Sequence, residues 1–523
     1  MTMKANRYLI VLVTLAACGR ATTAPERPSP RAPVHNIIPA PASWEPMATD
    51  TFTLATNAII VAQGGLQVER IARYLADLIG NTVESTPRVL AAADTTRSRI
   101  ELALDPQAPA GSESYDLSVT RERVRIAARA PAGLFYGVQT LRQLLPYAVE
   151  YTGAFARPMR IAGVHISDAP RYEYRGQHLD VARHFLGVRD VQRFMDMLAL
   201  YKLNRLHLHL SDDQGWRIEI PGWPKLTEIG GSSQVGGKGG GYYTQQDFRD
   251  LVQYASERFI TIVPEIDMPG HTNAALASYP ELNCDSVAPP LYTGTEVGFS
   301  LICLEKEITY KFIDDVVAAI TALNPAGPYF HMGGDEVKRA GREAYNRFVE
   351  RVEKIVEARG KRMIGWSEIA LANLSGNTIV QSWIPDSAHL MVARGAKVIL
   401  TPSARLYLDM QWDTTVPIGL HWAGYTDLST AYNWEPASFN PKVPDTAILG
   451  LEGALWAETL GTLSDFEYMA LPRLTALAEL AWSTPGVRNW QLFSRRIPAH
   501  EKRWTALGLN YHPFNPDALS TTQ

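Results

Sequence analysis

This sequence has no excess of basic charge, no long internal apolar run and few cysteines, and each of these features excludes some classes of protein. The net charge over 523 residues is only −4, so nothing points to nucleic acid. No internal apolar run reaches the roughly eighteen residues that a membrane-spanning helix requires. Three cysteines allow at most one intramolecular disulfide. A composition of 46% hydrophobic and 20% charged residues is ordinary for a globular protein, and the length suggests two or three domains.

The N-terminus has the organisation of a signal peptide, so residues 1–17 are left out of the fold. Lys4 and Arg7 precede an apolar run at 8–15 that is too short to span a bilayer. The Leu-Ala-Ala-Cys sequence ending at Cys18 resembles a bacterial lipobox, which predicts cleavage before this cysteine and lipid on its sulfur. We therefore expect an exported cell-envelope lipoprotein, periplasmic or on the cell surface, that meets the membrane only through its lipid anchor. The alternative is an ordinary signal peptide with an incidental cysteine.

The other two cysteines, Cys284 and Cys303, are candidates for a disulfide, because disulfides persist in exported proteins. They bracket an irregular segment that contains Pro and Gly and has no strong helical period. A bridge would close a loop of about twenty residues and contribute about 3 kcal/mol in the chain-entropy description. Two buried free thiols are the alternative.

The chain before residue 169 predicts a tether followed by a small α+β domain. Residues 18–34 are rich in Pro, Ala, Thr and Arg, which is typical of a flexible tether. Residues 35–168 show apolar periodicity but hold no convergent acids or histidines, so no catalytic site is expected there. An independent binding function of this domain is the alternative. The predicted strands are 51–61 and 99–104, the predicted hairpin is 115–119 with 123–127, and the predicted helices are 66–79 and 133–145.

Residues 169–523 repeat a pattern of strand, loop and helix, which predicts a (β/α)8 TIM barrel as the catalytic domain. Clear helices are predicted at 188–201, 245–258 and 310–323, and a closing helix at 490–507. Helix signals are weaker after the later strands, so that part of the count leans on the family resemblance described below. The eight candidate strands are Gly176–Val181, Arg205–Ser211, Ile260–Asp267, Tyr329–Gly334, Arg362–Ser367, Thr378–Trp383, Lys397–Thr401 and Ile448–Leu455.

Two motifs resemble binding sites of other kinds. Residues 236–241 are glycine-rich but lack the spacing and the Lys-Ser/Thr ending of a phosphate loop, so a flexible surface loop is predicted. His207 and His209 share one face of a candidate strand, as zinc ligands do in some barrel hydrolases. We interpret them as hydrogen-bonding supports and expect no metal. Activity that survives exhaustive chelation would dismiss the metal-dependent alternative.

The segment Tyr329–Glu336 carries the strongest functional signal. Its apolar start predicts a short buried strand, after which Gly333 and Gly334 let the backbone turn at an angle that a side chain would obstruct. Asp335 and Glu336 follow at once, where α/β barrels carry their chemistry. The alternative is that the two acids only stabilise the start of the next helix.

The sequence His-Met-Gly-Gly-Asp-Glu at 331–336 resembles the catalytic signature of family 20 glycoside hydrolases, the β-N-acetylhexosaminidases. This resemblance implies a barrel preceded by a small domain that packs against it. The motifs that extend it, in family order, are Arg175–Phe185, His207–Arg217, Pro264–His271, Gly365–Glu368, Gln381–Trp383, Leu406–Asp409 and Gly453–Glu458.

Glu336 is the candidate general acid, because a neighbouring carboxylate and partial burial would both raise its pKa. Family 20 enzymes are substrate-assisted. The carbonyl oxygen of the C2 acetamido group attacks the anomeric carbon, and an oxazolinium ion forms. The resemblance gives Asp335 the task of holding the acetamido N–H and stabilising that cation. No cofactor is expected.

The resemblance also implies a substrate pocket. Three tryptophans resemble an apolar box around the acetyl methyl group, although any one of them alone could be core packing. The matching residues are Trp366, Trp383 and Trp456 for the box, Tyr407 for the acetamido oxygen, Arg183, Asp409 and Glu458 for the sugar hydroxyls, and Asp212 and His271 as supports, with Glu265, Asp267 and His331 as weaker candidates.

The sequence therefore predicts an exo-acting, retaining β-N-acetylhexosaminidase that releases terminal β-linked GlcNAc or GalNAc from an oligosaccharide or glycan. Chitin fragments, peptidoglycan pieces and host glycans all fit this description. A metal-dependent barrel hydrolase is one rival. A non-catalytic sugar-binding lipoprotein is the other, and a simple aryl-glycoside assay would decide between it and an enzyme.

Overall fold

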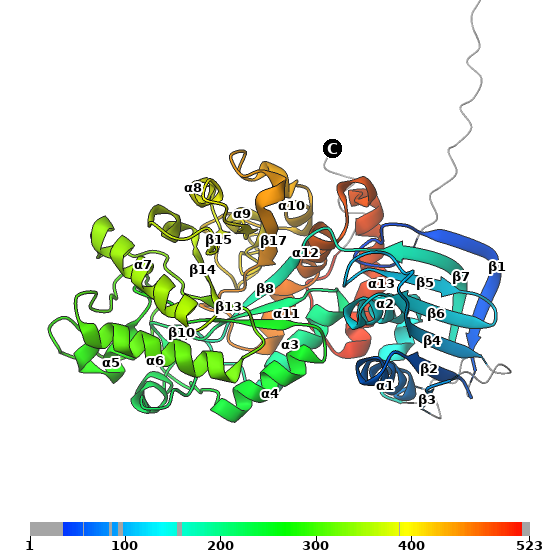
Figure 1. Ribbon diagram of the computed structural model, residues 1–523, viewed down its shortest axis with the longest axis horizontal. Coiled ribbons are helices and arrows are strands. Elements are labelled where there is room, and N and C mark those ends of the chain that lie inside the picture. The colour runs from blue at the N-terminus through cyan, green and yellow to red at the C-terminus, as the bar shows by residue number, and fades with distance from the viewer. Residues whose placement is uncertain are drawn as a thin grey trace, which may run out of the picture. The chain divides into compact units, whose positions relative to one another are not determined.

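A computed structural model describes residues 35–514, except for 56, 83–85, 93–97, 154–158 and 386. The predicted signal peptide, the lipidation site Cys18 and the tether lie outside the described residues. Within the described part, no helix is both long and apolar enough to cross a membrane. From Asn36 onward the chain forms one compact unit, in which a seven-stranded sheet precedes a closed barrel (Figure 1).

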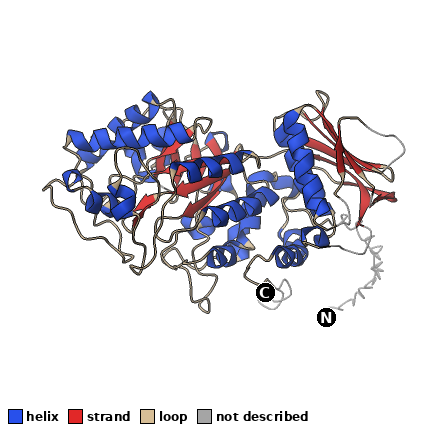
Figure 2. Cartoon of the chain, turned by 90° about the horizontal axis from the view of Figure 1, so that it is seen from below, coloured by secondary structure: helices blue, strands red, loops and turns tan. Residues whose placement is uncertain are grey.

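The N-terminal residues form a mixed sheet, with helices packed against one of its faces (Figure 2). Its elements are β1 (Glu45–Leu54), β2 (Ile59–Gln63), β3 (Arg88–Leu90), β4 (Arg99–Leu104), β5 (Tyr115–Val119), β6 (Arg123–Ala128), β7 (Met159–Asp168), α1 (Leu66–Gly80), α2 (Pro131–Leu144) and the 3-10 turn η1 (Tyr147–Glu150). The strand order is β1-β7-β5-β6-β4-β2-β3. The predicted hairpin is present as the antiparallel pair β5–β6.

The prediction of one strand over 51–61 is wrong. The backbone N–H of Ala58 donates to the carbonyl of Ala55 at 3.0 Å, and this turn separates β1 from β2. The two strands then occupy different places in the sheet, because β1 pairs with β7 whereas β2 lies between β3 and β4. In the sequence, the polar residues Thr56 and Asn57 stand between the apolar positions of the two strands, but the prediction extended one strand through them. The sequence analysis also did not anticipate β3 or β7.

Eight parallel strands close into a barrel, as predicted (Figure 1). They are β8 (Tyr174–Asp180), β9 (Arg205–His209), β12 (Thr261–Glu265), β13 (Tyr329–His331), β14 (Arg362–Trp366), β15 (Ile379–Ser382), β16 (Val398–Leu400) and β17 (Ile448–Gly453). Consecutive strands pair in order, and β17 pairs with β8 to close the ring. Each overlaps one predicted strand. β16 is the short apolar run that is typical of a strand buried on both faces, whereas β8 is equally buried but largely polar.

Among the helices between the barrel strands, α3, α4, α6 and α7 have 12–17 residues, whereas α5 and α8 to α10 have 4–6. The helical elements are α3 (Val188–Leu200), α4 (Gln245–Ser256), α5 (Asn273–Ser278), α6 (Glu307–Leu323), α7 (Arg342–Ala358), α8 (Ala388–Val392), α9 (Ser403–Leu406), α10 (Leu428–Tyr432), α11 (Leu463–Ala470), α12 (Arg473–Trp482) and α13 (Trp490–Leu507). Shorter turns are η2 (Leu226–Gly230), η3 (Pro280–Leu282), η4 (Ser367–Leu371), η5 (Pro436–Ser438), η6 (Asp445–Ala447) and η7 (Pro485–Val487), and a small hairpin pairs β10 (Ser211–Asp212) with β11 (Gly215–Trp216). The weak helix signals after the later strands reflect the brevity of α8 to α10.

A buried carboxylate at the end of the N-terminal sheet is shared with the barrel. Asp168, the last residue of β7, accepts hydrogen bonds from Lys202 Nζ at 2.9 Å and from the Tyr115 hydroxyl at 2.6 Å. Its other oxygen accepts from the indole N–H of Trp482 at 3.0 Å. Lys202 follows α3 and Trp482 ends α12, so one side chain ties the sheet to two parts of the barrel domain.

Cys284 and Cys303 form a disulfide, with an S–S distance of 2.08 Å. The bond closes the segment between η3 and α6, which has no regular secondary structure. The segment is also held from within the barrel, because the side-chain amide of Gln214 donates to the carbonyl of Gly294 at 2.9 Å.

Candidate active site

A cavity of about 270 Å³ opens where the barrel strands end. Ligand pockets for drug-sized molecules begin at about 300 Å³, so this cavity suits a single sugar ring. Its lining residues are Arg183, His271, Thr295, Val297, Asp335, Glu336, Trp366, Trp383, Tyr407, Asp409, Leu420, Trp422, Trp456 and Glu458. The cavity thus brings together every predicted catalytic and substrate-binding residue except Asp212, which lies behind the wall.

Four lining residues were missed by the sequence analysis. Thr295 and Val297 come from the disulfide-closed segment, and Leu420 and Trp422 come from the chain between β16 and β17. Trp422 is 57% exposed, which is unusual for so large an apolar side chain. The grouping of His421, Trp422 and Tyr425 in a segment without strand or helix periodicity could have drawn attention to it.

The turn after β13 aims both carboxyl groups at the cavity. A Cβ atom on Gly333, whose φ is 68°, would lie 1.7 Å from Asp267 Oδ1, so this position requires glycine. The Gly334 N–H donates to the same oxygen at 3.0 Å, and its carbonyl accepts from the Tyr345 hydroxyl at 2.6 Å. The next two side chains, Asp335 and Glu336, remain 14% and 31% exposed.

The surroundings of Glu336 favour its protonated form. Burial and then the negative charge of Asp335 raise the pKa of Glu336, and the nearby His271 opposes this rise. The Nε2 atom of His271 lies 3.7 Å from Glu336 Oε2 and 3.8 Å from Asp335 Oδ2. A carboxyl group with a raised pKa can hold a proton near neutral pH, as a general acid must.

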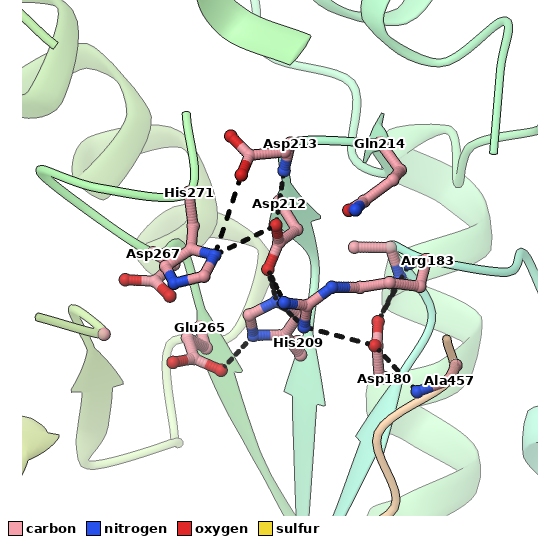
Figure 3. Close-up of polar contacts among 12 residues, drawn as sticks. Asp180, Arg183, His209, Asp212, Asp213, Gln214, Glu265, Asp267, His271 and Ala457 are labelled. Atoms are coloured by element: carbon pink, nitrogen blue, oxygen red, sulfur yellow. Dashed lines mark hydrogen bonds and ion pairs between the residues drawn. The ribbon is translucent and has the colours of Figure 1, made fainter. Parts of the chain in front are cut away.

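His271 is held as a cation beside this pair. Burial works against the charged ring, but the carboxylate of Asp212 outweighs it and raises the pKa of His271 well above its ordinary value. The two side chains meet at 3.2 Å through His271 Nδ1 and Asp212 Oδ1. Figure 3 shows the Asp212 carboxylate between His271 and the side chains of Arg183 and His209.

Arg183 is fixed before any ligand binds. Its Nη2 atom lies 2.7 Å from Asp212 Oδ2 and its Nη1 atom lies 3.3 Å from Asp180 Oδ2. Its guanidinium group also lies over the ring of Trp456, 4.9 Å from the centroid. Such a planar, preorganised fork is well suited to two adjacent hydroxyl groups.

Two carboxyl groups opposite this arginine have unused hydrogen-bonding capacity. Both side-chain oxygens of Asp409 and one of Glu458 are buried without a partner in hydrogen-bonding geometry among the described residues. Burial and their mutual proximity raise the pKa of Asp409 well above its ordinary value, and burial also raises that of Glu458. Buried polar atoms normally have partners, so these oxygens are suited to bind hydroxyl groups of a ligand.

The predicted aromatic box is present at one end of the cavity. The rings of Trp366 and Trp456 are 5.7 Å apart, and Tyr407 lies 6.3 Å from Trp456 and 6.5 Å from Trp383 between ring centroids. The indole N–H of Trp366 donates to Glu265 Oε1 at 2.9 Å, which fixes that wall. The result is an apolar recess with the Tyr407 ring along one side.

The His-x-His pair does not reach the cavity. His207 and His209 are fully buried, and each places both ring nitrogens near carboxylates of Glu265, Glu452 or Asp212. Three clusters of His, Asp and Glu side chains that are compact enough to hold a metal ion each include His207 or His209. No residue of these three clusters lines the cavity. The weaker candidates Glu265, Asp267 and His331 are likewise buried behind the wall.

The barrel and its cavity define an α/β-barrel hydrolase with two adjacent carboxyl groups in a tryptophan-lined pocket. The model of glycosyl hydrolase family 20, catalytic domain, matches residues 172–485, and that of glycosyl hydrolase family 20, domain 2, matches residues 34–169. The chain belongs to glycosyl hydrolase family 20 and is a glycoside hydrolase.

Characterised relatives cover nearly the whole chain. A beta-N-acetylhexosaminidase of Cellulomonas fimi is 39% identical over 480 residues, which span 91% of this chain and 95% of the relative. The structure of the GH20 beta-N-acetylhexosaminidase from Streptomyces coelicolor A3(2) has a TM-score of 0.89 and 44% identity, covering 92% of this chain and 98% of that one. A mutant Streptomyces plicatus beta-hexosaminidase in complex with product GlcNAc also has a TM-score of 0.89 and 44% identity, covering 94% and 99%.

Proposed function

We propose that the protein is an exo-acting, retaining β-N-acetylhexosaminidase that removes terminal β-linked GlcNAc or GalNAc by substrate-assisted catalysis. The observation that carries the proposal is a single sugar-sized cavity in which Asp335 and Glu336 face three tryptophans and Tyr407. The names of the relatives and the GlcNAc complex of one of them support the same activity.

In the proposed reaction, Glu336 gives its proton to the glycosidic oxygen as the bond from that oxygen to the anomeric carbon breaks. The carbonyl oxygen of the substrate's own acetamido group forms the new bond to the anomeric carbon, which produces an oxazolinium ion. Water then attacks that carbon, the bond from the acetamido oxygen to it breaks so that the acetamide is regenerated, and Glu336 takes up a proton from the water. Two inversions at one carbon retain its configuration.

Asp335, Tyr407 and the tryptophan box align the acetamido group in this proposal. Asp335 accepts the acetamido N–H and stabilises the positive charge that develops on the ring of the intermediate. The Tyr407 hydroxyl donates to the acetamido oxygen, and the box encloses the methyl group. Holding a nucleophile in line with the reacting carbon can supply several kcal/mol of the barrier reduction, up to about 7–11 kcal/mol in favourable cases.

The terminal sugar is held through its hydroxyl groups by Arg183, Asp409 and Glu458. The leaving group passes over the mouth of the cavity, where Trp422 lies on one side and Thr295 and Val297 also line the wall. An exposed tryptophan offers a flat apolar face on which a further sugar ring can lie. Chitin fragments, peptidoglycan pieces and host glycans all present such a ring, and a panel of natural oligosaccharides would rank them.

Substrates without the acetamido group test the proposal directly. β-GlcNAc and β-GalNAc aryl glycosides should be hydrolysed, whereas the matching β-glucosides and β-galactosides should react at least about 10³-fold more slowly, because they lack both the nucleophile and the group that fills the box. A thiazoline mimic of the oxazolinium ion should inhibit strongly. Comparable kcat/KM values for glucosides and GlcNAc glycosides would contradict the assignment of Asp335 and the box.

The proposal extends to location. The charged start, the short apolar run and the Leu-Ala-Ala-Cys sequence support an exported lipoprotein anchored through Cys18. Mass spectrometry of the mature N-terminal peptide should find Cys18 first and acylated. A product cleaved elsewhere, with Cys18 unmodified, would contradict lipidation without affecting the proposed reaction.

A further inference from the structure

Glu265, at the end of β12, lies at the centre of a fully buried polar cluster inside the barrel. One of its oxygens accepts the indole N–H of Trp366 at 2.9 Å, and His331 Nδ1 lies 3.0 Å from the same oxygen. The other oxygen lies 2.5 Å from His209 Nδ1 and 3.1 Å from His207 Nε2. Glu265 does not line the cavity, but its partner Trp366 does.

His209 connects Glu265 to a second carboxylate. Its Nδ1 atom faces Glu265, and its Nε2 atom lies 2.9 Å from Asp212 Oδ2. A histidine with a carboxylate on each ring nitrogen donates from both and is therefore a cation. The other charged or titratable groups that face it are His178, Asp180, Arg183 and Asp267.

Asp212 in turn contacts two residues that line the cavity, Arg183 and His271 (Figure 3). The same Oδ2 atom that faces His209 also holds Arg183 Nη2 at 2.7 Å. The Oδ1 atom lies 3.2 Å from His271 Nδ1, and the far nitrogen of that ring is within 4 Å of both Asp335 and Glu336. Charges therefore alternate from Glu265 through His209 and Asp212 to the cations beside the substrate.

We propose that Glu265 is a positioning residue that aligns both ends of the sugar site at once. It sets the wall of the acetamido box directly through Trp366, and through His209 and Asp212 it sets Arg183 and His271. This inference rests on the proposed function, because it assigns Trp366 and Arg183 to substrate binding. It also assigns a role to the buried His-x-His pair, which neither lines the cavity nor takes part in the proposed reaction steps.

The negative charge of Glu265 is the property that keeps His209 protonated. Burial lowers the pKa of His209, but the Glu265 and Asp212 carboxylates outweigh it and raise this pKa to about 10. His207 lies between Glu452 and Glu265, which raise its pKa to about 9 against the same burial. His209 is therefore a cation across the ordinary assay range, so Asp212 keeps this partner throughout, whereas the partners of His207 are Glu265 and Glu452.

Glu265→Gln keeps the size of the side chain but removes its charge. The pKa of His209 then falls towards neutrality, and the charge on its ring is kept below that pKa and lost above it. On an aryl β-GlcNAc glycoside, the ratio of variant to wild-type kcat/KM should fall about 10- to 100-fold near pH 8 and recover near pH 5. That range is the loss seen when an outer partner of a metal-binding histidine is removed.

Glu452→Gln is the matched control. Glu452 is equally buried and lies 2.8 Å from His207 Nδ1, but it contacts neither Trp366 nor His209 among the interactions of the described residues. Its variant should lose thermal stability and leave the pH dependence of the kcat/KM ratio flat. A flat ratio for Glu265→Gln as well would overturn the proposal.

His209→Asn serves if Glu265→Gln does not fold. The asparagine amide can still reach Glu265 but cannot reach Asp212, so KM should rise more than kcat falls as Arg183 loses support. An unchanged KM would count against the proposal. Absence of any wild-type hydrolysis of GlcNAc glycosides would instead reject the proposed function, so the two failures can be told apart.

Discussion

Replacing Glu336 by glutamine is expected to lower kcat/KM on chitobiose by about 10²- to 10⁴-fold, the usual loss when a general acid is removed. The amide keeps the shape and hydrogen bonds of the side chain but cannot give a proton to the leaving oxygen. A nitrophenolate leaves with little need of protonation, so the deficit should shrink on nitrophenyl β-GlcNAc. Steady-state kinetics of the variant and wild type on both substrates measure this difference.

Asp335→Asn is the matched variant, because it changes the adjacent residue by the same chemical step. It weakens the orientation of the acetamido group and the stabilisation of the cation whatever group departs. Its deficit should therefore be similar on chitobiose and on the nitrophenyl substrate. If leaving-group dependence appears in Asp335→Asn and is absent from Glu336→Gln, the two roles are assigned backwards.

The pH dependence provides a second signature of Glu336. Burial and the charge of Asp335 raise its pKa. In the proposed reaction the protonated form of Glu336 is the one that acts. The kcat/KM on chitobiose should therefore be highest below the raised pKa of Glu336 and should fall as the pH rises through this pKa. Glu336→Gln should lack this basic limb, because the amide does not titrate.

Asp168→Asn is expected to have the largest effect on stability, a loss of about 3–5 kcal/mol in the free energy of unfolding, the range for one member of a buried ion pair. The substitution leaves Lys202 buried without its counter-ion and disturbs the bonds from Tyr115 and Trp482. Urea titration followed by both intrinsic tryptophan fluorescence and circular dichroism would measure the loss and show whether the sheet and barrel still unfold together.

Two comparisons interpret that experiment. Glu307→Ala breaks a pair with Arg351, in which the Glu307 side chain is 80% exposed and that of Arg351 is 42% exposed, and should change the free energy of unfolding little. Lys202→Met in the Asp168→Asn background should recover part of the loss, because it removes the unpaired cation. A loss for Asp168→Asn no larger than that of the surface control would show that the sheet and the barrel are not coupled through this carboxylate.

Most of the barrel could be predicted from the sequence because its signals are local. Several buried parallel strands contain short apolar runs, and α4 begins at a capping box, in which Thr244 and Asp247 bond each other's backbone N–H groups. The closing helix runs from Trp490 to Leu507 as predicted, between the capping side chain of Asn489 and a left-handed Gly508. The prediction of a single strand over 51–61 was wrong because it did not use the local turn signal of the polar pair Thr56-Asn57.

The predicted catalytic pair could also be identified from the local sequence alone. Gly333, Gly334, Asp335 and Glu336 are consecutive, so their turn and their place after a strand can be found without knowing any other part of the chain. The resemblance to a family added Arg183, Trp366, Tyr407 and the rest as separate matches. It could not give distances, and only the closed barrel brings those matches around one cavity.

Only the tertiary structure determined the contacts between segments that are remote in sequence. Barrel closure places Glu265 beside Trp366 and His209, and it turns the His-x-His pair away from the cavity into a buried ionic cluster. The disulfide-closed segment and the loop that carries Trp422 reach the mouth of the site without any periodic signal. The physical reason is that strand and turn preferences are set by neighbouring residues, whereas burial, pairing of charges and the raised pKa of Glu336 depend on which distant side chains the fold brings within a few ångströms.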